Sequence, residues 1–142
     1  MIDPELVIRK LVLITSDLSE LGRIARTPLA DYLASPTHEL VVERYLERVI
    51  GRMIDINYHL ITEAGQTPPT DYHDSFTRLV KLGVLSREFA PQIAACAGLR
   101  NRIAHEYDEL DPRKVYDALQ TTLRDIPVYL QRVRDYLDRC ER

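Results

Sequence analysis

Apolar residues recur every three or four positions along most of this chain, and that spacing limits its possible folds more than any other feature. The first long stretch steps by four and three residues through Val7, Leu11, Ile14, Leu18, Leu21 and Ala25. Residues spaced in this way lie on one face of an α-helix, whereas a half-buried β-strand alternates every second residue. No strand-like alternation and no internal repeat stands out. The pattern therefore predicts an all-α fold in which amphipathic helices pack into a bundle.

Three pairs of residues mark helix starts. Asp3-Pro4, Ser35-Pro36 and Asp111-Pro112 each place a capping side chain before a proline that fits the first helical turn. They open long helices expected over residues 3–25, 35–64 and 111–137. The middle one is apolar over more than one seam, so we expect it to lie at the centre of the bundle or at a subunit contact.

Weaker signals divide the rest of the chain. Residues 27–34 are expected to form a short irregular turn, and residues 66–72, with two prolines, form the main loop. A short helix is predicted over 74–82, followed by a long one from Ser86 to about His105. Pro91 kinks that helix or marks its true start, and Pro127 is expected to bend the last helix. The result is a mostly antiparallel bundle of four long helices plus a short one, predicted as a single domain over residues 1–142.

Composition excludes several classes of protein. Apolar residues make up 45% of the chain and charged residues 29%, which fits neither a disordered nor a membrane-spanning chain. The formal net charge of −3 means that any contact with nucleic acid requires a local basic patch. Cys96 and Cys140 form no paired framework and no signal-peptide pattern opens the chain, so a cytoplasmic location is expected. The four histidines lack metal-ligand spacing, so we expect neither a metal site nor a cofactor. His38 and His73 are expected at the surface.

The strongest candidates for catalytic residues lie at 98–107, which read Gly-Leu-Arg-Asn-Arg-Ile-Ala-His-Glu-Tyr. Arginine binds phosphate and stabilises its growing charge, and histidine transfers protons near neutral pH. Asn101 and His105 are four residues apart and therefore neighbours, but Arg100 and His105 lie about 140° apart around the helix axis. They share a face only if the helix frays, the arginine reaches around, or two copies meet across a two-fold axis. The plainer interpretation is that two basic residues complement the dipole at the end of a helix.

The wider pattern resembles the HepT toxins of the HEPN superfamily, whose ribonucleases carry R-x4-6-H and, in the HepT branch, R-x4-H-x-Y. The motif at 98–107 is followed by Asp111-Pro112 and Val115-Tyr116, as in that branch. Residues 54–61, Ile-Asp-Ile-Asn-Tyr-His-Leu-Ile, resemble its D-x-x-x-H segment. Residues 72–76, leading to Leu79 and Gly83, also match. The similarity runs in order along nearly the whole chain.

The resemblance implies a HEPN-like helical fold, a homodimer and a metal-independent endonuclease that cuts RNA. Neither DNA nor a membrane is expected as a partner. It implies that Arg100 and His105 are catalytic and that Asn101 supports them. It also implies an antitoxin partner, the nucleotidyltransferase MntA, which transfers AMP to the motif tyrosine. That tyrosine is Tyr107 here. An AMP group would add an anion and bulk that block the cleft.

Other interpretations remain open from the sequence. Asp55 and His59, near Arg48 and Arg52, form either a solvated stripe or, by resemblance, a supporting layer or dimer-cleft contact. Basic residues at the end of the last helix alternate with acids, which favours a solvated face over an RNA track: Arg132, Arg134, Arg139 and Arg142. The rival function is a catalytically silent helical dimer that binds a nucleotide or a partner protein.

Overall fold

The computed structural model describes residues 1–141, which contain helices and no β-strand, so the all-α prediction is confirmed. The helices, in chain order, are α1 (Pro4–Ala25), α2 (Leu29–Leu33), α3 (Pro36–Glu63), α4 (Tyr72–Thr77), α5 (Ala90–His105), the 3-10 turn η1 (Tyr107–Glu109) and α6 (Pro112–Cys140). Arg142 lies outside the described residues. None of the described helices is both long and apolar enough to cross a membrane.

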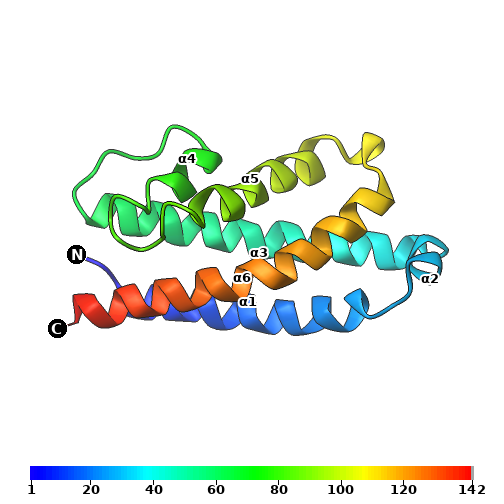
Figure 1. The fold of residues 1–142 in the computed structure, drawn as a ribbon, viewed down its shortest axis with the longest axis horizontal. Coiled ribbons are helices and arrows are strands. Elements are labelled where there is room, and N and C mark those ends of the chain that lie inside the picture. The colour runs from blue at the N-terminus through cyan, green and yellow to red at the C-terminus, as the bar shows by residue number, and fades with distance from the viewer. Residues whose placement is uncertain (142) are drawn as a thin grey trace.

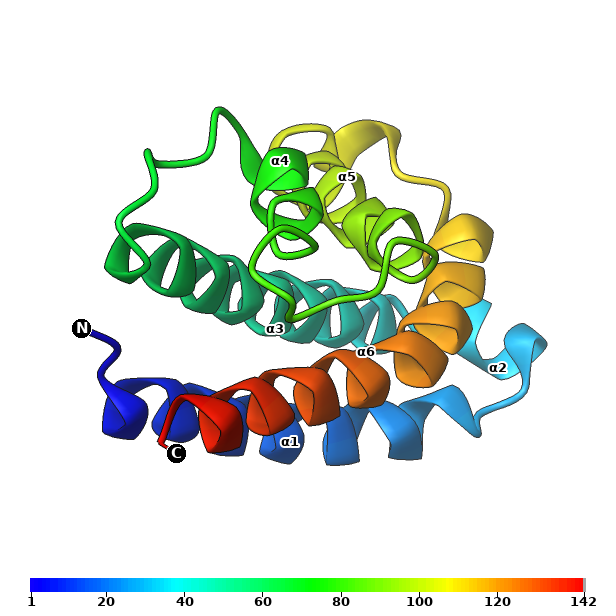
Figure 2. The same ribbon diagram turned by 60° about the vertical axis from the view of Figure 1, so that its left-hand side comes forward.

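The four long helices α1, α3, α5 and α6 alternate in direction, as an antiparallel bundle requires (Figure 1). Figure 2 shows α3 between α5 and α4 on one side and α1 and α6 on the other, and α3 packs against each of the other five α-helices. Its wide apolar face is therefore used inside the chain: Ile50, Ile54 and Ile61 are all buried. Of the two positions expected for this helix, the structure shows the central one.

All three predicted start signals act as helix caps. The Asp3 carboxylate accepts a hydrogen bond from the Leu6 N–H at 3.2 Å, and the Ser35 hydroxyl accepts one from the His38 N–H at 3.3 Å. Asp111 caps α6 in the same way, by accepting from the Arg113 N–H at 3.0 Å. These bonds satisfy backbone groups that a helix end leaves unpaired. The chain continues helically through Pro127, and Figure 2 shows the curved course of α6.

The short elements differ from the sequence prediction. The turn at 27–34 contains a short helix, α2, and α4 spans Tyr72–Thr77 rather than 74–82. It begins early because the Asp71 carboxylate accepts the Asp74 N–H at 2.7 Å, and it ends early because Gly83, at φ 80°, turns the chain so that Val84 and Leu85 are buried. The third long helix, α5, begins at Ala90 because Ser86 caps a preceding turn through the Phe89 N–H. Pro91 thus marks a helix start rather than a kink.

A chain of buried hydrogen bonds joins α6, α3 and α4. The Tyr129 hydroxyl donates to the Asn57 side-chain oxygen at 2.6 Å, and the Asn57 amide donates to the Ser75 hydroxyl at 3.1 Å. The Ser75 hydroxyl in turn donates to the Tyr72 carbonyl at 2.6 Å. Burial raises the pKa of the Tyr129 phenol well above its ordinary value, so this donor keeps its proton. Every polar side chain in this network has a partner, which fixes how α4 sits on α3.

We predict that Tyr129→Phe lowers the free energy of unfolding by about 1–3 kcal/mol, because it leaves a buried Asn57 oxygen without its donor. Urea unfolding followed by circular dichroism measures the change. Tyr136→Phe is the control, since that half-buried tyrosine lies on the same helix outside this network. Equal, small effects of the two substitutions would show that the network adds nothing specific.

Candidate active site

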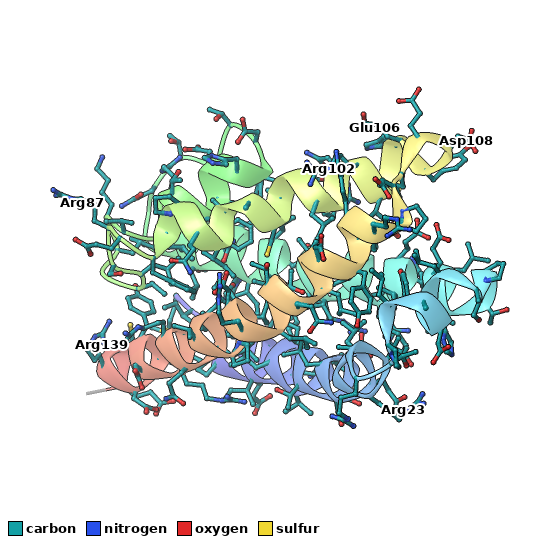
Figure 3. All side chains as sticks on the ribbon, turned by 45° about the vertical axis from the view of Figure 1, so that its right-hand side comes forward. Arg23, Arg87, Arg102, Glu106, Asp108 and Arg139 are labelled. Carbon is teal, nitrogen blue, oxygen red and sulfur yellow. The ribbon has the colours of Figure 1, made fainter. Side chains whose placement is uncertain are left out.

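The end of α5 exposes the histidine and the tyrosine of the motif. His105 is the last residue of α5, where the Glu106 N–H closes the helix by donating to the Arg102 carbonyl at 2.8 Å. Tyr107 follows in η1 and its surface is 68% exposed. The helix ends here because the chain must reach Asp111-Pro112, which opens α6. Figure 3 shows Arg102, Glu106 and Asp108 in order along this end of α5 and into the turn.

Within one chain, Arg100 and His105 lie in different surface hollows, as their five-residue spacing indicates. His105 and Tyr107 line a shallow hollow of about 190 Å³, together with three carboxylate residues, Glu106, Asp108 and Glu109. Arg100 is half-buried and lines a separate pocket of about 650 Å³. Asn101 is exposed beside His105, and no hydrogen bond joins these two side chains in the described part of the chain. The arginine and the histidine are thus not brought to one point by a single chain.

The pocket around Arg100 is built by three helices. We call it the arginine pocket; its lining residues are Arg48, Gly51, Arg52, Ile54, Asp55, Tyr58, Tyr72 and Arg100. The Arg100 guanidinium carbon lies 5.2 Å from the centre of the Tyr72 ring, a cation–π distance, and Tyr72 packs edge-on against Tyr58. Burial and the neighbouring Tyr72 raise the pKa of Tyr58, so its phenol stays neutral. Cations and flat rings together suit a nucleotide, which carries a phosphate and a base.

Asp17 holds two of these arginines in place. Its side chain is only 7% exposed, and it accepts hydrogen bonds from Arg52 at 2.7 Å and from Arg48 at 3.2 Å. Asp17 was not among the residues predicted for the site, although an acid between Ile14 and Leu21 in an apolar seam is a signal that could have found it. Tyr72 belongs to the matching segment 72–76, but no role was predicted for it, because its contact with Arg100 depends on how α4 and α5 pack.

The residues Asp55 and His59 have separate partners. Asp55 lines the arginine pocket and forms an ion pair with Lys10 at 3.2 Å. His59, one turn further along α3, accepts the Asp3 N–H on its Nε2 atom at 2.9 Å and so anchors the start of α1. The stripe is therefore partly solvated, with Asp55 facing the pocket and His59 facing the end of another helix.

The remaining cysteine and histidine candidates offer little support for a catalytic or metal-binding role. Burial raises the pKa of the Cys96 thiol to about 12, with Asp125 contributing, so Cys96 is a core residue rather than a nucleophile. His73 is exposed, whereas His38 is half-buried, with its Nδ1 atom buried and unpaired, so the prediction that both lie at the surface is right for His73 alone. Within residues 1–141, no three side chains of the metal-binding types lie close enough together to hold an ion.

Solved structures share this fold. A structure of tri-AMPylated Shewanella oneidensis HEPN toxin in complex with MNT antitoxin matches with a TM-score of 0.83 and 23% identity, over 95% of this chain and 99% of that one. A toxin–antitoxin structure with AMP-PNP matches with a TM-score of 0.82 and 21% identity, over 92% and 98%. YutE from Bacillus subtilis, a cytosolic protein of unknown function, matches with a TM-score of 0.79, 21% identity and coverage of 96% and 92%.

Sequence comparison extends the match beyond fold. The family model described as ribonuclease HepT-like matches residues 14–133. A tRNA nuclease HepT from Aphanizomenon flos-aquae (strain 2012/KM1/D3) is 35% identical over 136 residues, which cover 96% of this chain and 92% of that protein. An mRNA nuclease HepT from Shewanella oneidensis is 27% identical over 89 residues, or 63% and 67% of the two chains. The chain therefore belongs to the HepT-like ribonuclease family.

We predict that Asp17→Asn lowers the free energy of unfolding by about 2 kcal/mol, because two guanidinium groups then lose a buried carboxylate. Chemical denaturation at neutral pH measures the loss. Asp55→Asn is the matched control: its side chain is 61% exposed, so its ion pair with Lys10 contributes below about 1 kcal/mol. A loss at Asp17 no larger than at Asp55 would show that burial does not strengthen this cluster.

Proposed function

We propose that this chain is the toxin of a HepT–MntA toxin–antitoxin pair and that it cuts RNA in the cytoplasm as a metal-independent endonuclease. The observation that carries the proposal is the exposed pair of His105, the last residue of α5, and Tyr107, in the turn that follows it. The same helix carries Arg100, which lines a cationic pocket. It occurs in a chain that is 35% identical to a tRNA nuclease HepT. We further propose that residues 1–142 act as one domain.

In the proposed reaction the 2′-hydroxyl of RNA attacks the adjacent phosphorus. The oxygen–phosphorus bond to the ribose forms as the bond to the 5′-oxygen of the next nucleotide breaks. His105 takes the proton of the 2′-hydroxyl, and His105 of the second copy gives a proton to the departing 5′-oxygen. Arg100 binds the phosphate and stabilises the charge that develops on it. Asn101 and Asp55 support the site from beside the reacting groups. His59 supports it indirectly, by holding the start of α1 in place. The products are a 2′,3′-cyclic phosphate and a 5′-hydroxyl.

A homodimer supplies what one chain lacks. The hollow that contains His105 is otherwise lined by Tyr107 and three carboxylates, which repel a phosphate, so the arginine has to come from elsewhere. In a two-fold pair, each copy can present Arg100 to the His105 of the other. The apolar face of α3 is buried inside the chain and does not supply this contact; a dimer is proposed because Arg100 and His105 lie in separate hollows of one chain.

We predict that the purified chain cuts RNA in the presence of EDTA and does not cut DNA of the same sequence. Transfer RNA is the first substrate to test. Arg100→Ala and His105→Ala should each reduce cleavage at least a hundredfold while leaving the unfolding midpoint within about 3 °C of the parent chain, because neither side chain lies in the core. Gel electrophoresis and mass spectrometry of the RNA ends measure both rate and end chemistry.

Strict dependence of cleavage on magnesium would contradict this mechanism, as would a 3′-hydroxyl end. RNA binding without cleavage would support the rival function of a silent nucleotide-binding dimer. Gly22→Ala is a suitable control for both assays, since this helical position lies on α1, outside both hollows.

For control of the toxin, we propose that a nucleotidyltransferase antitoxin modifies Tyr107. The phenol oxygen attacks the α-phosphorus of ATP, the phenol loses its proton, and pyrophosphate leaves. The exposure of Tyr107 supports this step, and so does its place in the same hollow as His105, where an added AMP would cover the histidine. The fold match to a tri-AMPylated HEPN toxin points the same way.

We predict that Tyr107→Phe escapes neutralisation, because it keeps the ring but lacks the acceptor oxygen. After co-expression with the cognate nucleotidyltransferase, peptide mass spectrometry should show AMP on the parent peptide and none on the variant. Tyr136→Phe, with its half-buried ring on α6, should be modified and silenced like the parent chain. A fully neutralised parent with an unmodified Tyr107 would mean that simple occlusion silences the toxin.

A further inference from the structure

The arginine pocket holds more positive charge than one phosphate contact at Arg100 requires. Arg48, Arg52 and Arg100 all line it. Lys10 offsets Asp55, and Asp17 offsets only one of the two arginines that it contacts. The pocket thus keeps a net positive charge in a chain whose formal net charge is −3. Such a local cationic patch on an acidic protein attracts an anion to one place rather than to the whole surface.

The position of Arg52 is set in advance. Its guanidinium donates to the buried Asp17 carboxylate at 2.7 Å, and its side chain remains 20% exposed at the pocket. An arginine that is already ordered loses less conformational freedom when it binds a ligand. Asp17 therefore acts on the pocket as a positioning residue, from beneath its surface.

Gly51 leaves open space at the pocket wall. It lies in the interior of α3, where glycine is less favourable than alanine, and it lines the pocket. A methyl group added at Gly51 would meet no atom of another element within 4 Å. Packing inside the chain therefore does not require a glycine here. A ligand in the pocket therefore has room to touch the α3 backbone at this position.

We propose that the arginine pocket is a subsite for the nucleotide next to the cleaved bond of RNA, in which Arg52 and Arg48 bind the neighbouring phosphate and Tyr58 and Tyr72 contact its base. The inference rests on the proposed function and deepens it, since Arg100 connects this pocket to the reacting phosphate. Gly51 allows the sugar–phosphate backbone to lie against α3, and Asp17 holds Arg52 toward it.

The observations favour RNA over a second copy of the chain as the occupant. A two-fold contact at this pocket would place its three arginines close to the same three arginines of the other copy, and like charges repel. The pocket walls also contain the two kinds of side chain with which proteins bind single-stranded RNA: guanidinium groups for phosphates and aromatic rings for bases.

The test measures binding rather than cleavage. The His105→Ala chain is mixed with a fluorescein-labelled single-stranded RNA of about ten nucleotides, long enough to fill one binding groove. Fluorescence anisotropy is read in EDTA over a range of salt concentrations. Arg52→Gln, introduced into the His105→Ala chain, should weaken RNA binding about tenfold. It should also reduce the slope of log affinity against log salt by about one, the change expected on losing one phosphate contact.

Two further variants separate the explanations. Gly51→Ala should raise the unfolding midpoint by about 3 °C and weaken RNA binding several-fold, whereas Gly22→Ala, also in open space within a helix, should raise the midpoint alike and leave binding unchanged. Asp17→Asn should weaken binding, because Arg52 loses its support. If net charge alone mattered, removing this acid would tighten binding instead.

Unchanged affinity in Arg52→Gln and Gly51→Ala would overturn the subsite while leaving the cleavage proposal intact, since cleavage by the parent chain is measured separately. Sedimentation tests the other occupant. If Gly51→Ala blocks pairing of two copies and RNA affinity does not otherwise change, the pocket is a contact between copies and the subsite is overturned. A parent chain that neither binds nor cuts RNA would remove both proposals.

Discussion

The buried hydrogen bonds of Asn57 hold the elements of the candidate site together. Its oxygen accepts from Tyr129 of α6 and its amide donates to Ser75 of α4. Buried amides are costly without partners, so these three helices pack stably in only one relative position. In that position the Tyr72 ring lies against the Arg100 guanidinium. The core network thus fixes the helix that carries Tyr72, the ring that the α5 arginine contacts.

Charge is divided between two neighbouring regions along α5. The arginine pocket is cationic, and its arginines are fixed by buried Asp17 and by the Tyr72 ring. The end of the helix carries His105 among carboxylates. A phosphate is attracted to the first region and repelled by the second, whereas the proposed proton transfer uses the second. The cleavage that we propose therefore calls for the cationic region of one copy next to the histidine of another.

The helices and their start signals were predictable because side-chain periodicity and capping are local properties. The end of α4 was not, because burial of Val84 and Leu85 overrides the local pattern. The place of His105 and Tyr107 at a helix end was predictable because the start signal Asp111-Pro112 follows closely. The partners of Arg52 and Arg100, Asp17 and Tyr72, come from other helices and depend on packing between elements far apart in sequence.

The composite site is tested most directly by pairing two inactive chains. Arg100→Ala and His105→Ala chains with different affinity tags are co-expressed, and the mixed dimer is purified through both tags. It contains one arginine and one histidine that can meet at one phosphate. It should therefore cut RNA at least tenfold faster than either parent dimer, because it regains a proton-transfer group relative to the His105→Ala dimer and the phosphate-binding arginine relative to the Arg100→Ala dimer. It should stay slower than the unmutated dimer, because only one of the two histidines is present. A mixed dimer as inactive as its parents, or no mixed dimer at all, would contradict the account.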